Sequence, residues 1–525
     1  MKPINHTENL YAALWKSSVT EVLAGELGID GPSGGIELDH PILVGVERHL
    51  EYLEAGRHVP RPPADRADLD DPQVAAYLSE LHHRIAHARI AAEPQLEAQL
   101  RRQLADFKHG GARWEQMAIR YFEYYAQYPY HLAGTPRYRS WQAPDAGGGD
   151  PQFAVVRWTL PADGRVAIVG DIGTGTDVAA ATLLAALSFK PDAILHLGDV
   201  YYAGTKFEFA HRFTGLLHSV FQAQDVRVPV FGVPGNHEYF TGAIAYLDCL
   251  DSQQLAAEPD QRQQASYFSL RSADGGWQFL GMDTGYYGHT MSVPLQEQQA
   301  ALHVLHRRDP AVPLTLSAAA GPLPVGGTVH LRDDEALWHR RHASSFAGRT
   351  ILLSHHQLYS ATEECGTAQR SLAGGGGSTV PDPSDLDRAY VDTDIWRQLG
   401  PLFGDHVAAW FWGHEHNLVI FEDEYRPADW PSDLGADGAT LRVLPKGRCC
   451  GHGAIPVNES EKPYAQTHPV PLKDPRLTLG LTDGWYNRGF EIIDLAGAGD
   501  PARVRYFQVA GVDPTPLMIY EETVS

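Results

Sequence analysis

Six short apolar segments of this chain each end abruptly at a residue whose side chain can bind a metal ion. The apolar runs cover residues 166–169, 194–197, 230–233, 277–280, 351–353 and 408–412. The polar residues that follow them are Asp171, Asp199, Asn236 with His237, Asp283, His355 with His356, and His414 with His416. Buried strands of α/β sheets are continuous hydrophobic runs, and such sheets gather ligands at the carboxyl ends of their strands. The pattern therefore predicts an α/β fold in which loops at strand ends assemble a metal cluster.

The bulk properties of the chain exclude several classes of function. A formal charge of -23 over 525 residues disfavours nucleic-acid binding, which needs a basic surface, and docking on anionic membranes. No apolar stretch is long enough to span a bilayer, and the first residues lack the apolar core of a secretory signal. We therefore expect a cytoplasmic protein. The sequence carries no signal of an oligomeric state.

The length predicts two or three domains, and the composition changes near residue 150. Residues 1–150 are predicted to be a helical region, because apolar residues recur at three and four between 71 and 127. Residues 151–511 are predicted to be the catalytic domain, and 512–525 a C-terminal tail. His82, His83 and His87 on the first helix could bind zinc, but a solvated helix face is the favoured interpretation.

Three loops and one strand pair are further expectations. Residues 143–150 have the composition of a linker. Residues 310–330 and 374–378 are expected to be either mobile covers of a site or disordered, and the cover is favoured for 374–378 because it follows His355 closely. Residues 489–494 and 502–507 are predicted to be antiparallel strands at a sheet edge.

The side chains after the apolar runs suit a pair of metal ions. Two carboxylates, one amide oxygen and three imidazoles are too many for a single tetrahedral site but fit two ions that share a carboxylate: Asp171, Asp199, Asn236, His355, His414 and His416. Two metal ions about 3.5–4 Å apart can activate a bridging water and bind both the attacking and the leaving oxygen. Hydrolysis of a phosphate ester or a related anion is the reaction that such a site serves best.

The order of these motifs resembles that of a known superfamily. Gly170-Asp171, Gly198-Asp199, Gly235-Asn236-His237-Glu238, His355 and Gly413-His414-Glu415-His416 are similar to the five motifs of the calcineurin-like metallophosphoesterases. That superfamily usually begins Asp-x-His, whereas Gly173 stands at the third position here. Purple acid phosphatases share this departure and supply a tyrosine three residues after the second aspartate, where this chain has Tyr202.

The resemblance implies a four-layer α/β/β/α fold, a β-sandwich flanked by helices, and a role for each matching residue. The first metal would be bound by Asp171, Asp199, Tyr202 and His416, and the second by Asn236, His355 and His414, with Asp199 bridging. The alternative for Tyr202 is a core aromatic, with a water in its place at the site. The implied metals are iron paired with zinc, manganese or iron. His237 would either protonate the leaving group, since its unperturbed pKa lies near the operating pH, or steady the transferring phosphoryl group, and Glu238 could orient it. His356 either reaches the substrate or packs at the rim of the site.

Other polar residues are weaker candidates. Arg448 and His452 could bind phosphate oxygens, and the alternative is that they belong to a glycine-rich turn between edge strands. Asp283 and Thr284 are expected to be structural. The implied activity is that of a purple acid phosphatase-like phosphomonoesterase acting on a small phosphorylated substrate by attack of a metal-bridging hydroxide. The alternatives are a phosphodiesterase for cyclic nucleotides or glycerophosphodiesters and, less favoured, a non-catalytic scaffold.

Overall fold

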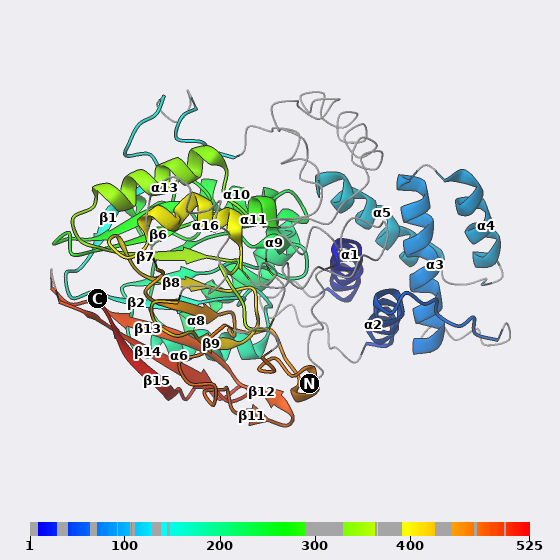
Figure 1. Cartoon of the computed structure of the whole chain (residues 1–525). Coiled ribbons are helices and arrows are strands. Elements are labelled where there is room, and N and C mark those ends of the chain that lie inside the picture. Colours follow the sequence, from blue (N-terminus) through cyan, green and yellow to red (C-terminus); the bar gives the residue numbers. More distant parts are fainter. Residues whose placement is uncertain are drawn as a thin grey trace, which may run out of the picture.

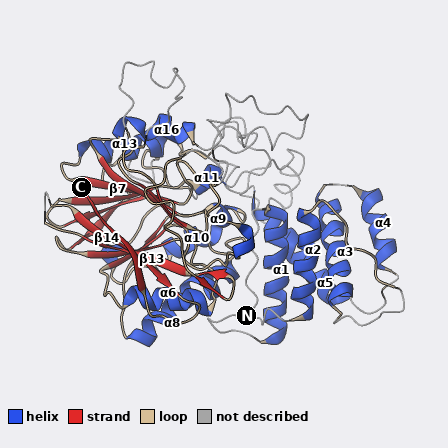
Figure 2. Ribbon diagram, turned by 60° about the horizontal axis from the view of Figure 1, so that its bottom comes forward, coloured by secondary structure: helices blue, strands red, loops and turns tan. Residues whose placement is uncertain are grey.

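The described residues of the computed structural model form a β-sandwich flanked by helices, with a group of helices beside it (Figures 1 and 2). They comprise residues 9–28, 40–63, 71–91, 93–105, 107, 111–128, 138–143, 148–288, 329–362, 365, 391–425, 443–466, 470–497 and 500–525. The segments expected at 310–330 and 374–378 lie almost entirely outside these residues, as does half of the expected linker.

One sheet has six strands among the described residues, in the order β15-β14-β13-β2-β3-β4. Their bounds are β2 Arg165–Val169, β3 Ala193–His196, β4 Val230–Gly232, β13 Arg488–Asp494, β14 Ala502–Val509 and β15 Leu517–Val524. Strands β2, β3 and β4 are parallel to one another, and β13, β14 and β15 extend the sheet with antiparallel pairing. The strand pair expected at 489–494 and 502–507 is confirmed. The expected tail at 512–525 is wrong, because most of it forms β15 and pairs with β14.

The other large sheet has seven strands among the described residues, in the order β1-β5-β6-β7-β8-β10-β9. Their bounds are β1 Val155–Leu160, β5 Phe268–Ser272, β6 Trp277–Gly281, β7 Arg349–Ser354, β8 Val407–Trp412, β9 Leu418–Ile420 and β10 Gly447–Cys450. Strands β6, β7 and β8 are parallel neighbours. All six apolar runs of the sequence are therefore strands, three in each sheet. A small hairpin of β11 Leu481–Thr482 and β12 Trp485–Tyr486 lies apart from both sheets.

The two sheets pack face to face, and helices cover their outer faces (Figure 2). Residues such as Ile168, Phe279 and Phe411 fill the space between the sheets and are fully buried. Helices α6 Asp177–Leu187 and α8 Gly215–Gln224 cover the six-stranded sheet, and α13 Asp333–Ser345 and α16 Thr393–Leu399 cover the other. The four-layer fold is thus confirmed.

Shorter helices connect the strands. They are α7 Lys206–Glu208, a π-helix at Phe209–Thr214, α9 Asn236–Tyr239, α10 Ile244–Asp251, α11 Gly285–Gly288, and 3₁₀ turns at Pro259–Gln261, Gly400–Leu402 and Glu459–Glu461.

The described N-terminal residues form helices that pack on one another beside the sandwich (Figure 1). They are α1 Leu10–Leu27, α2 Pro41–Glu54, α3 Pro72–Ile90, α4 Pro94–Leu104 and α5 Gly111–Gln127. Helix α3 begins as expected, with Asp71 as its N-cap and Pro72 in the first turn. The expected solvated face is wrong, because His82 and His83 are buried and the His83 ring stacks on Trp15 at 5.1 Å. Among the described residues, no helix is long and apolar enough to cross a lipid bilayer.

Candidate metal centre

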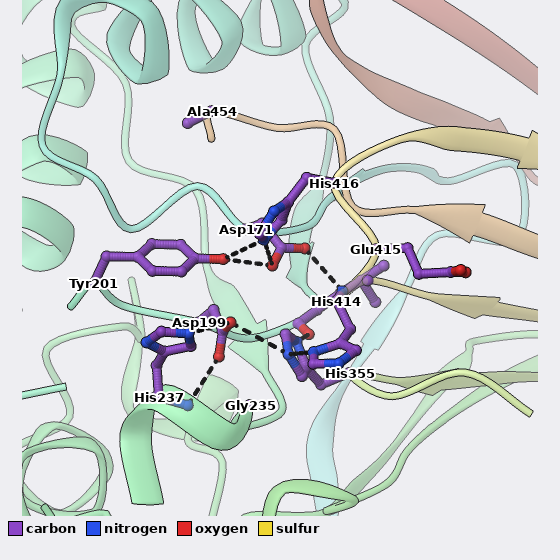
Figure 3. A network of polar contacts seen from close by, with 12 residues as sticks. Asp171, Asp199, Tyr201, Gly235, His237, His355, His414, Glu415, His416 and Ala454 are labelled. Carbon is purple, nitrogen blue, oxygen red and sulfur yellow. Dashed lines mark hydrogen bonds and ion pairs between the residues drawn. The ribbon is translucent and has the colours of Figure 1, made fainter. Parts of the chain in front are cut away.

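Loops at the carboxyl ends of strands from both sheets meet at one edge of the sandwich (Figure 3). Asp171 follows β2 and Asp199 follows β3, while Asn236 begins α9 just after β4. His355 follows β7 and His414 follows β8. Asp171, Asp199 and His355 are fully buried, so the sequence-predicted ligands are brought together in the interior rather than spread over the surface.

The backbone around these residues is tightly constrained. Asp171, Asp199 and His414 have positive φ angles of 55°, 73° and 69°, in the left-handed region that non-glycine residues seldom adopt. A Cβ atom on Gly413 would lie 2.7 Å from Asp171 Oδ2, so only glycine fits between the two loops. Strained backbone of this kind is concentrated at functional sites, where the surrounding structure holds it in place.

His355 is the centre of one group of ligand atoms. Its Nδ1 lies 2.9 Å from the carbonyl oxygen of Leu197, which can only accept, so Nδ1 carries the hydrogen. Its Nε2 lies 3.0 Å from Asn236 Oδ1, 3.2 Å from His414 Nδ1 and 3.3 Å from Asp199 Oδ2. In the neutral ring this nitrogen presents a lone pair, and a carbonyl that fixes the other nitrogen is the usual companion of a metal-binding histidine.

Asp171 organises a second group. Its Oδ1 accepts a hydrogen bond of 2.7 Å from the Tyr201 hydroxyl and lies 3.4 Å from His416 Nε2. The Tyr201 oxygen is itself 3.0 Å from His416 Nε2, and Asp171 Oδ2 accepts from the His414 amide at 3.1 Å. Phenol, imidazole and carboxylate thus meet at a point next to the first group.

The tyrosine at this position differs from the expected one. Tyr202 was expected as a ligand, but its ring packs in the cluster formed with the N-terminal helices, 4.3 Å from Lys16 Nζ. Tyr201 faces Asp171 instead (Figure 3). At Gly173, where the superfamily carries histidine, an added Cβ would lie 2.6 Å from Val200 Cα, so the backbone of Val200 leaves no room for a side chain.

Burial and charge have opposite effects on the pKa values of this site. Burial alone would raise the pKa of Asp171, but the hydrogen bond from His416 and the charge of His355 lower it. Burial alone would lower the pKa of His355, yet the Asp199 carboxylate beside it raises that pKa to about 10. The Asp171 carboxylate therefore stays ionised, and its charge suits a bound cation.

Among the described residues, two groups of side chains place their ligand atoms close enough together to bind a metal ion. Ligand atoms of Asp171, Asp199 and His355 all lie within 4.8 Å of one another, and the same holds for His355, His356 and His414. Oxygen and imidazole donors in this mixture fit iron, zinc or manganese. His355 belongs to both groups, so the two sets of donor atoms adjoin each other.

His237 lies beside these ligands, held by the backbone. Its Nδ1 donates a short hydrogen bond to the Tyr202 carbonyl, and its Nε2 lies 3.8 Å from Asp199 Oδ2. Glu238, expected to orient His237, is placed elsewhere. One of its carboxylate oxygens accepts from the amides of Gly235 at 2.8 Å and Asp199 at 3.2 Å. Glu238 therefore holds two ligand loops together, and burial, followed by the Asp199 charge, raises its pKa to about 8.

His356 lies at the centre, where its ring centroid is 4.6 Å from that of His414. Its amide donates to Thr284 Oγ1 at 3.0 Å, and its Nδ1 is 3.1 Å from the same oxygen. Thr284 thus supports a residue of the site, and Asp283 accepts a 2.6 Å hydrogen bond from Tyr239 of α9. Contact of His356 with substrate stays a prediction.

Arg448 and His452 do not face the metal centre. Arg448 is fully buried, bound to Glu522 through two hydrogen bonds of 2.7 Å and to Asp423 at 2.8 Å. His452 is 1% exposed, and burial lowers its pKa to about 3. Both expectations of substrate binding are wrong, because Arg448 on β10 pairs with Glu522 of β15 and with Asp423, and His452 is buried.

Sequence reasoning missed Tyr201 and Glu208. Tyr201 is next to Tyr202 in the sequence, and the two differ only in that the Tyr201 side chain points toward Asp171. Glu208 has a local signal, because Thr205 and Glu208 form a capping box at the start of α7.

Comparison with known proteins identifies the class to which this fold and site belong. Residues 164–418 match the family model of the calcineurin-like phosphoesterases. The chain therefore carries a calcineurin-like phosphoesterase domain over these residues. The resemblance inferred from the motifs is confirmed. None of the curated proteins matches the sequence.

The solved structures that are similar to the chain include those of two proteins. One is a purple acid phosphatase, PPD1, isolated from yellow lupin (Lupinus luteus) seeds, with 13% identity and a TM-score of 0.35 over 69% of this chain and 54% of that chain. The other is PhoD, with 11% identity and a TM-score of 0.40 over 70% of this chain and 69% of that chain. The chain thus spans about half the length of the lupin protein.

Proposed function

We propose that this protein hydrolyses phosphate monoesters with two metal ions bound at the centre described above. The observation that carries the proposal is the convergence of carboxylate, amide and imidazole groups around His355 Nε2, all within 3.3 Å of it. These groups come from loops of both sheets, and their burial would be unfavourable without a cation to share their charge.

The geometry supports a specific set of ligands. Asp171, Asp199, Tyr201 and His416 would hold the first ion, with Tyr201 in place of the expected Tyr202. Asn236, His355 and His414 would hold the second, and Asp199 would be shared. A phenol ligand suits a ferric ion, which supports iron paired with zinc, manganese or iron. When bound, such a pair lowers the pKa of a nucleophilic water and neutralises charge on the phosphate.

The chain's own residues supply the proton transfer. Because Nδ1 of His237 is committed to the Tyr202 carbonyl, Nε2 is the atom that gains or releases a proton. That nitrogen lies beside Asp199, where a leaving oxygen could accept its proton. Asn236 and His237 are consecutive on α9, so one helix start positions both a ligand and the proposed general acid.

Metal analysis and turnover of two chromogenic substrates test this proposal. The purified protein should contain two metal ions per chain and hydrolyse an aryl phosphate monoester faster than a bis-aryl diester. Asn236→Ala should lose one metal ion, whereas His237→Ala should keep both and lower kcat by about 10²- to 10⁴-fold. His218→Ala, on an exposed histidine of α8, is the matched control.

The outcomes separate the alternatives. Faster turnover of the diester would favour a phosphodiesterase, and two bound ions without turnover of either ester would favour a scaffold. A preparation that binds fewer than two ions under metal-replete conditions would contradict the proposal. A small phosphorylated substrate and a cytoplasmic location stay predictions.

A further inference from the structure

One buried carboxylate organises the loop that follows Asp199. Glu208 is 1% exposed, and its Oε1 accepts from the Tyr202 amide at 2.5 Å while Oε2 accepts from the amides of Ala203 and Thr205 at 3.0 Å each. Oε1 also accepts from the Ser17 hydroxyl of α1 at 2.8 Å, and Arg212 Nη1 lies 3.5 Å from the same oxygen. A hydroxyl from the N-terminal helices therefore completes the hydrogen bonding of a loop at the metal centre.

A second residue of α1 contacts the same loop. Lys16 is 3% exposed, its Nζ is 2.9 Å from Glu47 Oε1, and it lies 4.3 Å from the centre of the Tyr202 ring. Arg212 Cζ lies 4.8 Å from the centre of that ring. Two cations thus contact one aromatic ring, a favourable arrangement in a desolvated site. Arg212 also donates to the Tyr201 carbonyl at 2.8 Å, so both tyrosines are held.

The two tyrosines act on the site through different atoms. Tyr201 presents its hydroxyl to Asp171 and His416, and Tyr202 presents its carbonyl to His237 Nδ1. Exchanging the directions of the two side chains would require the backbone at these residues to turn, which would move both the Tyr201 hydroxyl and the Tyr202 carbonyl. The placement of the Tyr202 ring against α1 therefore bears on both a proposed ligand and the proposed general acid.

We propose that helix α1 is an integral part of the metal centre, with Ser17 and Lys16 as positioning residues that select which tyrosine faces the first metal. This inference rests on the proposed function. Apolar side chains alone could attach the helices to the sandwich, as Phe240 and Ile455 do in the shared hydrophobic cluster. Burying Lys16 and Glu208 at that interface costs free energy, which their ion pairs with Glu47 and Arg212 offset only in the right geometry.

Substitutions on one face of α1 test the proposal. Ser17→Ala removes the hydrogen bond to Glu208, and Lys16→Met keeps the length of the side chain but removes its charge. Ser18→Ala is the matched control, because Ser18 is equally buried and its hydroxyl donates only within α1, to the Leu14 carbonyl at 2.7 Å. Ser17→Thr restores the hydroxyl. The readouts are the dissociation constants of the two metal ions by chelator competition and the pH profile of kcat.

We expect Ser17→Ala and Lys16→Met to weaken the binding of one ion by about 10- to 100-fold, as loss of supporting groups around metal ligands does. The other ion should bind as in the wild type. The pH profile should shift, because the partner of His237 moves, and Ser17→Thr should restore both. Variants that lose only thermal stability, with metal binding and pH profile equal to Ser18→Ala, would overturn this inference and leave the proposed function intact. A wild-type protein that binds no metal pair would overturn both.

Discussion

Two backbone carbonyls decide what two histidines of the site can do. Leu197 accepts from Nδ1 of His355, and Tyr202 accepts from Nδ1 of His237. In each ring the other nitrogen is directed toward Asp199, at 3.3 Å and 3.8 Å. The two rings therefore present Nε2 to the same carboxylate, one as a proposed ligand and the other as a proposed proton donor.

Substitutions of Glu238 distinguish its observed role from that of a charged partner of His237. Glu238→Gln should keep metal binding and most of kcat, because an amide oxygen can still accept from Gly235 and Asp199. Glu238→Ala should weaken metal binding by about 10- to 100-fold, since both ligand loops lose an anchor. Steady-state kinetics with metal titration measures both effects. Equal losses in the two variants would show that the charge itself matters.

At the scale of elements, the N-terminal helices bury imidazoles whose protonation is unfavourable in the folded state. Burial, followed by the charge of Arg84, lowers the pKa of His49 to about 3, and burial, followed by Arg101, lowers that of His82 to about 4. Trp15 and Ser79 share a 2.8 Å hydrogen bond in the same interior, and Ser79 is also 2.8 Å from His49. These helices are thus packed around neutral rings.

We expect these helices to lose stability in mild acid. In the unfolded chain these histidines have a pKa of about 6.5 and bind protons below that pH, whereas in the folded chain they stay neutral. The free energy of unfolding therefore falls as the pH drops. Each such histidine lowers the free energy of unfolding at pH 5 by about 2 kcal/mol relative to pH 7. Thermal unfolding followed between pH 7 and pH 5 measures this, and His82→Gln should flatten the dependence. A transition temperature independent of pH over this range would contradict the prediction.

On the scale of the whole molecule, the metal centre joins the two sheets. Asp171 and Asp199 extend from the six-stranded sheet, and His355 and His414 from the seven-stranded sheet. Direct polar contacts between them include Asp199 with His355 at 3.3 Å and Asp171 with the His414 amide at 3.1 Å. Ions bound here would link the two halves of the sandwich.

Metal removal should therefore destabilise the fold as well as abolish turnover. A ligand that binds only the folded state stabilises it by about 4 kcal/mol at a thousandfold excess over its dissociation constant. Dialysis against a chelator should lower the Tm, and restoring the metals should reverse the change. Differential scanning calorimetry measures it, with Asn236→Ala as a variant that gains less from added metal. An unchanged Tm would show that the ions contribute nothing to holding the sheets together.

The sequence by itself determined the strands and the chemical types of the ligands. Apolar runs such as 166–169 and 351–353 are local signals, and the residue at each strand end follows directly from them. The carboxyl ends of parallel strands share one edge of a sheet, so these ligands were predicted to meet and the structure brings them together. The order of the motifs predicted a calcineurin-like phosphoesterase domain, and the comparison with the family model confirmed it.

Only the tertiary structure decided the direction and partners of individual side chains. Tyr201 and Tyr202 are adjacent and chemically equal, and contacts from Lys16, far away in the sequence, separate them. Arg448 binds Glu522 of the last strand rather than substrate, and the tail that carries Glu522 is an edge strand. Local patterns record burial and periodicity, whereas the pairing of a charge or a hydroxyl depends on segments that become neighbours only when the chain folds.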